Sequence, residues 1–159
     1  MANGDLVGAT EEVVRAGMYP YWDADLKRVT PSAFTSEAVS VSRLAILNFA
    51  EIVLIFNKDF NGRVDGDQQP LKVRVTGRAT VVEIVMQAEQ PMNDKKNSLP
   101  NVILTVVEDK IENDESCADN PAHALICGWE RENPTVPRKI SRGVANRLID
   151  IFTWTPLQD

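Results

Sequence analysis

The stretch Asn120-Pro121-Ala122-His123-Ala124-Leu125-Ile126-Cys127-Gly128-Trp129 holds the only histidine of the chain, one of its two cysteines and one of its three tryptophans. After the Asn-Pro pair its residues are mostly small or apolar, which favours a buried strand. Side chains of a strand point alternately to its two faces. One predicted face therefore carries His123, Leu125, Cys127 and Trp129, and the other carries Ala122, Ala124, Ile126 and Gly128.

Outward from this strand, the sequence predicts three more. Val102–Val107 is rich in β-branched residues, which pack well on a pleated surface. Val39–Ser42 and Lys72–Thr76 alternate between apolar and polar residues, as half-buried strands do. Gly77 is expected to turn the chain after Lys72–Thr76.

Two helices have clear boundaries. Thr80-Val81-Val82-Glu83 matches a capping box and predicts a helix from Val81 to about Gln90, which Pro91 ends. A terminal helix is predicted from apolar residues at helical spacing, namely Ile140, Val144, Leu148, Ile151 and Phe152.

Two other segments are less well defined. Leu44–Phe56, with Ser42 as its cap, is apolar almost throughout, so a helix here would have to be buried. Its second half, Ile52–Phe56, fits a helix or a central strand. A short helix from Thr10 to Arg15, ended by Gly17, is also expected.

The predicted order is strand, helix, strand, helix, strand, strand, helix. This order indicates an α/β or α+β fold, a mixed sheet of about four to five strands with about three packed helices. At 159 residues the chain is expected to form a single domain over 1–159, with 1–9 and 155–159 frayed.

Composition narrows the classes of function. The formal net charge is −6 and the pI about 4.9, which makes nucleic acid an unfavoured partner. The first residues do not resemble a signal peptide, and the longest apolar run, Ile52–Phe56, is far too short to span a bilayer. With only two cysteines, the expected location is the cytoplasm with both thiols reduced. No cofactor is expected, because the chain has no glycine-rich phosphate loop, nucleophile elbow or Cys-x-x-Cys pair.

His123 has two interpretations, a general acid or base and a satisfied side chain at the edge of the core. A zinc site is disfavoured, because four strand positions separate His123 from Cys127 by about 13 Å. Asn57–Gln68 has the outline of a calcium loop, but Asn stands at its first position and Gln at its last, where a bidentate glutamate belongs. We therefore expect no tightly bound metal.

Polar and aromatic side chains suggest two binding sites. Arg43 follows Ser40 and Ser42, and such a group of hydroxyls and a guanidinium could hold a phosphate or a carboxylate. Arg28 also lies near the end of a predicted element. The aromatic cluster of Tyr19, Tyr21 and Trp22 fits either a docking surface or a chain end packed on the core.

Two stretches resemble a widespread group of small uncharacterised bacterial proteins. One is Arg28-Val29-Thr30-Pro31-Ser32-Ala33-Phe34 leading to Ser40-Val41-Ser42-Arg43, and the other is Asn120-Pro121-Ala122-His123-Ala124. The group implies no activity. The resemblance implies that the two stretches meet at one place.

Two functions of different class follow from these features. The first is a bacterial accessory protein that binds another protein of its operon. The second is a metal-independent enzyme acting on a phosphate-containing substrate, with His123 as acid or base and Arg28 and Arg43 holding charge. The enzyme hypothesis requires His123 and Arg43 in a common cleft.

A shared site also predicts a strand pairing. The histidine strand should pair with, or lie over, the strand that ends at Ser42. His123 would then be partly exposed, and a nearby arginine would lower its pKa and keep it neutral near pH 7.

Overall fold

The computed structural model describes residues 4–18, 20–23, 25–60, 62–64, 66–91 and 98–157. Tyr19, one of the predicted binding residues, lies outside these ranges. The elements are β1 (Glu12–Gly17), β2 (Trp22–Asp23), β3 (Arg28–Val29), the 3-10 helix η1 (Pro31–Phe34), β4 (Ala38–Arg43), α1 (Phe49–Phe60), β5 (Val75–Thr80), α2 (Val81–Met86), β6 (Val102–Glu108), β7 (His123–Glu130), α3 (Arg142–Ile151) and β8 (Thr153–Pro156).

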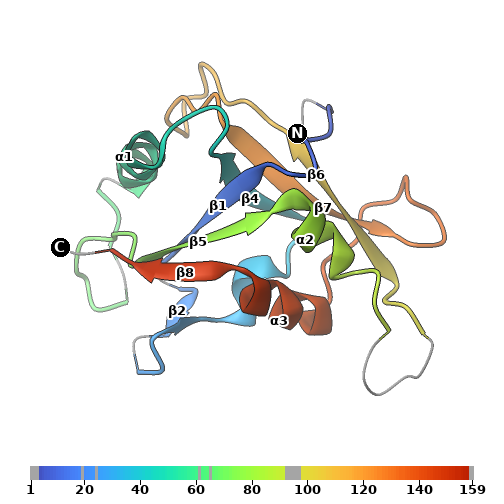
Figure 1. Cartoon of the computed structure of the whole chain (residues 1–159). Helices are drawn as coiled ribbons and strands as arrows, with labels where there is room; N and C mark the ends of the chain where they lie inside the picture. The colour runs from blue at the N-terminus through green and yellow to red at the C-terminus, as the bar shows by residue number, and fades with distance from the viewer. Residues whose placement is uncertain are drawn as a thin grey trace.

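The fold is α+β (Figure 1). In the described residues, six strands form one sheet in the order β6-β7-β4-β1-β5-β8, and β2 pairs with β3 in a separate two-stranded sheet. Every pair of these strands is antiparallel, so the prediction of a mixed sheet of four to five strands is wrong. The predicted number of three helices is confirmed for the described residues, which also contain η1.

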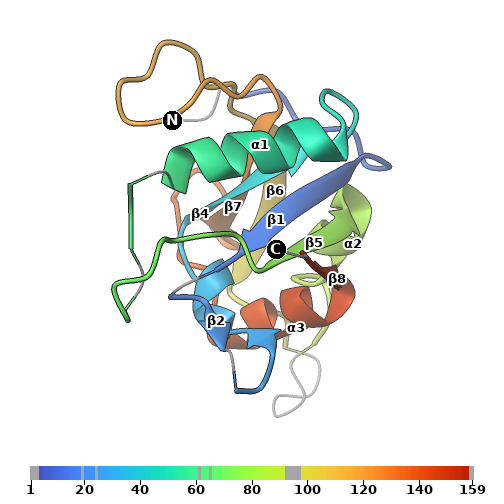
Figure 2. The same ribbon diagram turned by 90° about the vertical axis from the view of Figure 1, so that its left-hand side faces the viewer.

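Helices lie on both faces of the large sheet. The main core lies on the face covered by α2, α3 and η1, where Phe34, Ile84 and Leu148 are fully buried against sheet residues such as Ile126. On the other face, Figure 2 shows α1 lying across β4 and β1. Phe56 and Phe60 of α1 pack there with a smaller cluster of Ala16, Met18 and Val73.

The predicted histidine strand is confirmed as β7. Ala124, Ile126 and Gly128 are buried on the core face, while His123 and Leu125 face the other way and are partly exposed. β4 lies beside β7 with Ser42 opposite His123 in register, which confirms the predicted strand pairing. The two stretches that carry the resemblance therefore meet.

The predicted helix over Thr10–Arg15 is wrong, because these residues enter β1, the strand between β4 and β5. Val13 and Val14 are completely buried there, and adjacent β-branched residues suit a central strand better than a helix. Gly77 is not a turn either. It lies inside β5, and a Cβ at this position would come within 2.6 Å of the Trp154 ring, so only glycine leaves room for that side chain.

The chain ends are also more ordered than predicted. β8 includes Thr155 and Pro156 and pairs with β5, and the backbone amide of Leu157 donates to the carbonyl of Arg74 (2.9 Å). Near the other end, Leu6 bridges to Val107 of β6. Of the segments predicted to fray, only residues 1–3 and 158–159 lie outside the described ranges.

The apolar segment before the calcium-like stretch forms α1, which resolves Ile52–Phe56 as a helix. Ser42 does not cap this helix, because it is a strand residue and α1 begins at Phe49. The expected burial is also wrong. Ile52 is the fully buried residue of α1, whereas Leu54 is 61 % exposed, because only one side of the helix packs on the sheet (Figure 2).

The capping box at Thr80 is confirmed. The Thr80 hydroxyl accepts a hydrogen bond from the backbone amide of Glu83 (3.3 Å), and the Glu83 carboxylate accepts one from the amide of Thr80 (3.2 Å). The helix is shorter than predicted and ends at Met86.

We expect Thr80→Ala to lower the free energy of unfolding by about 1 kcal/mol, because the amide of Glu83 loses its acceptor. Urea denaturation measures this change, and Thr80→Ser, which keeps the hydroxyl, is the control. An unchanged denaturation midpoint in Thr80→Ala would contradict the role of the cap.

Candidate functional site

The large sheet divides between β1 and β4. In the described residues these strands pair at two positions, Val13 with Arg43 and Val14 with Ser42. Beyond them β1 continues beside β5 as far as Gly17, while β4 stays beside β7. The strands therefore diverge from Arg15 onward and leave backbone groups of β4 without a strand partner on that side.

The Arg15 side chain lies between β1 and β4 where these strands diverge. Its Nη1 donates to the carbonyl of Ser40 (3.1 Å) and its Nη2 to the carbonyl of Ala33 (2.9 Å), so the side chain replaces part of the missing strand pairing. The guanidinium lies 5.9 Å from the centre of the Phe34 ring. Its Nε is buried and has no acceptor in the described residues. Burial lowers the pKa of Arg15 to about 10, which still leaves it a cation at neutral pH.

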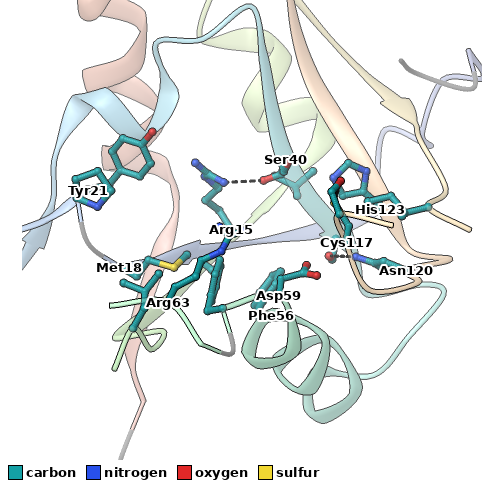
Figure 3. Close-up of a pocket in the computed structure, with 18 residues that line it drawn as sticks. Arg15, Met18, Tyr21, Ser40, Phe56, Asp59, Arg63, Cys117, Asn120 and His123 are labelled. Atoms are coloured by element: carbon teal, nitrogen blue, oxygen red, sulfur yellow. Dashed lines mark hydrogen bonds between the residues drawn. The ribbon is translucent and has the colours of Figure 1, made fainter. Parts of the chain in front are cut away.

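A pocket of about 430 Å³ opens at this divergence, between the sheet, α1 and the 111–120 segment (Figure 3). Figure 3 shows Arg15 and Ser40 between two ends, one with Tyr21, Met18 and Arg63, the other with His123, Cys117 and Asn120. Its lining is Arg15, Ala16, Met18, Pro20, Tyr21, Ser40, Val41, Ser42, Phe56, Asp59, Phe60, Arg63, Leu71, Ile111, Ser116, Cys117, Asn120 and His123.

His123 is oriented by Asp109. Its Nδ1 lies 2.8 Å from the backbone carbonyl of Asp109 and 3.1 Å from the carboxylate Oδ2 of the same residue. Two acceptors at one nitrogen place the proton on Nδ1 in the neutral ring, which leaves the Nε2 lone pair to accept a proton. The predicted neighbour of this histidine was an arginine, but the charged group beside it is a carboxylate.

Ser42 and Asn120 form the wall next to His123. The amide of Arg43 donates to the carbonyl of Ala122 (2.9 Å), so Ser42 and His123 form the adjacent pair without mutual backbone bonds, in which side chains are closest. The Ser42 hydroxyl accepts from the Asn120 side-chain amide (3.1 Å), whose oxygen accepts from the amide of Ala122 (3.0 Å). This buried network holds the start of β7 against β4.

The 111–120 segment closes over the pocket as a loop fixed at its base. The amide of Ile111 donates to the carbonyl of Asn120 (3.1 Å), and the amide of Asn120 donates back (2.9 Å). Asp59 of α1 ties this loop to the helix, since its Oδ1 accepts from the amide of Ala118 (2.7 Å). The loop brings Ser116 and the exposed free thiol of Cys117 to the pocket.

Arg43 lies outside this pocket. Its guanidinium points to two carboxylates, with Nε and Nη2 each 2.8 Å from Glu11 oxygens and Nη1 2.6 Å from Glu108 Oε1. Neighbouring residues of a strand face opposite ways, so placing Ser42 on the pocket side turns Arg43 away from it. The common cleft of His123 and Arg43 that the enzyme hypothesis requires is therefore not present, and Arg15 is the arginine beside the histidine's pocket.

Only some of the other predicted binding residues line the pocket. Ser40, Ser42 and Tyr21 line the pocket. Arg28 is exposed in β3 and does not line it. Tyr21 and Trp22 are partly buried and pack against the main core. This agrees with the second interpretation of the aromatic cluster, in which its rings pack on the core.

The calcium-like stretch has a different local structure from a calcium loop. Its first four residues, Asn57 to Phe60, form the last turn of α1, and Asn61 and Asp65 lie outside the described ranges. No group of three or more His, Cys, Asp or Glu side chains within the described ranges is placed to hold a metal ion.

Comparisons with models of protein families, with curated proteins and with solved structures find no match. The resemblance in two short stretches therefore stays a prediction. In the described part of the chain, no helix is long and apolar enough to cross a membrane.

Proposed function

We propose that this protein binds a small phosphate-containing molecule in the pocket at the β1–β4 divergence and catalyses a proton transfer on it through His123. The observation that carries the proposal is Arg15, a half-buried cation whose Nε is enclosed without an acceptor and which forms no ion pair within the described residues. Holding a charge partly out of water without a counter-ion is costly, and an anionic ligand would supply one.

The charges of the pocket support an anion. Its lining contains the cations Arg15 and Arg63 and a single carboxylate, Asp59, which is engaged with the amide of Ala118. The lining is thus more positive than the chain as a whole, whose net charge is −6. Arginine also suits phosphate oxygens, because its planar group presents several donors at once.

His123 supports chemistry in addition to binding. Hydrogen bonds from Nδ1 to Asp109 fix the ring and its tautomer, so Nε2 is the nitrogen available to a ligand. A general base needs this combination of a fixed orientation and a free lone pair. The residues assigned to the proposed site are Arg15 for the anion, His123 for the proton, and Asp109 for orientation of the histidine.

The apolar end of the pocket supports a ligand with a carbon skeleton. Met18, Phe56, Phe60 and Leu71 line the pocket and belong to the smaller apolar cluster. A phosphate monoester would place its charged group near Arg15 and its carbon chain against these side chains.

The proposal is tested with a panel of phosphate monoesters and the alcohols they derive from. The esters should raise the unfolding temperature, more so at higher concentration, and the alcohols should not. A ligand that binds only the folded state stabilises that state by mass action. Conversion is followed by NMR in D₂O. A base acting on carbon replaces a ligand proton with deuterium, whereas a base acting on water releases inorganic phosphate. An unfolding temperature that no ester changes would argue against the proposal.

Binding of a protein from the same operon stays a prediction. The large exposed apolar side chains belong to separate elements, among them Leu6 before β1, Leu54 on α1 and Met86 on α2. Scattered exposed apolar residues are normal on a protein surface. We therefore favour the small-molecule pocket.

A further inference from the structure

We propose that the ligand carries a protonated amine in addition to its phosphate, so that it belongs to the class of aminoalkyl phosphates. This inference rests on the proposed function, because it names the ligand class of the same pocket. The juxtaposition that leads to it is that of Arg15 and Asp59, two opposite charges that line one pocket without meeting.

Arg15 and Asp59 come from different walls. Arg15 projects from β1 into the divergence of the sheet, and Asp59 lies on the last turn of α1 (Figure 3). Within the described residues, neither side chain forms an ion pair, with the other or with a third group. A ligand that carries both charges would give each of them a partner, which a simple anion would not.

The Asp59 carboxylate is already oriented for such a contact. One oxygen, Oδ1, accepts from the amide of Ala118 and thereby fixes the side chain. The other oxygen accepts no hydrogen bond in the part of the chain that is described. A carboxylate oxygen held at the surface of a pocket is a suitable acceptor for an ammonium group.

The charged residues around Asp59 add little to its own preference for a cation. The loop that it holds carries four further carboxylates on eight residues, Glu112, Asp114, Glu115 and Asp119, all in the segment that closes the pocket. Arg63 and these four carboxylates are all exposed, so solvent screens their charges alike. The preference of this part of the pocket for a cation therefore rests on Asp59, which lines it, and Arg15 is the anion-binding group of the same pocket.

The test compares alkyl phosphates with their amino and hydroxyl derivatives by calorimetry at pH 7. Ethyl and propyl phosphate are paired with aminoethyl and aminopropyl phosphate, and hydroxyethyl and hydroxypropyl phosphate control for added polarity. We expect the amine to tighten binding about tenfold at the chain length that spans the two residues. The hydroxyl should give less than about a threefold gain, since it adds no charge.

Asp59→Asn is the matching variant. Asparagine keeps an oxygen acceptor for the amide of Ala118, so the loop stays attached while the charge is lost. The amine's tenfold gain should fall to about twofold or less in this variant, and affinity for the plain alkyl phosphates should be no weaker, since a negative charge has left the pocket. Glu115→Gln removes the same charge from the loop at a residue that does not line the pocket, and should retain most of the gain.

Three results would overturn the inference. They are equal affinity for amino and plain alkyl phosphates, a gain that the hydroxyl derivatives reproduce, and a gain that persists in Asp59→Asn. The ligand series on the unaltered protein decides the first two even if the variant does not fold. If alkyl phosphates bind without an amine effect, the amine is wrong and the phosphate site stands, whereas binding of no phosphate at all would count against the proposed function itself.

Discussion

His123→Gln is expected to slow conversion of the phosphate-containing ligand by about 100-fold or more, which is the usual contribution of a general base. Glutamine has no titratable group, so it cannot accept the proton that Nε2 would take. Unfolding free energy should change by only about 1 kcal/mol, because the side chain is partly exposed and glutamine can still donate to Asp109. Ligand affinity should remain within about threefold, since Arg15 binds the anion.

Comparing kinetics with denaturation separates a chemical role from a structural one. Conversion rates are measured by NMR on the ester that the unaltered protein converts, and stability is measured by urea denaturation. A variant that loses several kcal/mol of stability while its conversion rate per folded molecule stays unchanged would assign His123 a structural role only.

Arg43→Met is expected to lower the free energy of unfolding by about 3 kcal/mol. The guanidinium connects Glu11, just before β1, to Glu108 at the end of β6, and so joins the outer strand β6 to the middle of the sheet. Methionine leaves both carboxylates partly buried without a partner. The exposed Arg142→Met on α3 is the control and should change stability by less than about 0.5 kcal/mol.

The loss of stability caused by Arg43→Met should depend on pH in a defined direction. The hydrogen bond from Arg43 holds the pKa of Glu11 below its ordinary value of 4.5. A depressed pKa in the folded state stabilises the protein above the unfolded pKa, and this stabilisation is lost as the pH falls through the folded value. The difference in stability between the unaltered protein and Arg43→Met should therefore shrink below about pH 4.5. Equal stability of the two proteins at pH 7 would contradict this assignment.

Patterns within single elements predicted much of the fold. The run of small and apolar residues in β7, the β-branched run in β6 and the capping box of α2 each involve a few neighbouring residues, so they can be recognised in the sequence alone. β1 and β8 were missed because their strand character comes from distant partners. Val13 and Val14 lie in a strand that pairs with β4 and β5 on its two sides, and Trp154 packs on the rings of Phe34 and Phe152.

The site was predicted in part. The pairing of the histidine strand with the strand that ends at Ser42 followed from two short motifs. Arg43 was wrongly grouped with Ser42, because neighbouring residues of a strand face opposite ways and the sequence alone does not say which of the two faces a pocket. Arg15 was missed because the segment was interpreted as a helix. In a strand, Val13, Arg15 and Gly17 share one face, and an arginine on the face of a buried valine indicates a charge drawn partly into the protein and in need of a partner.

The most direct test of the central claim, that Arg15 binds a phosphate group in this pocket, is calorimetric titration of propyl phosphate into the unaltered protein and Arg15→Met. Methionine removes a half-buried charge together with two hydrogen bonds to backbone carbonyls, so stability should change by only about 1 kcal/mol. We predict saturable binding by the unaltered protein and affinity about 30-fold weaker in Arg15→Met, with Arg142→Met unaffected. Equal affinity in all three proteins, or no binding by the unaltered one, would contradict the account.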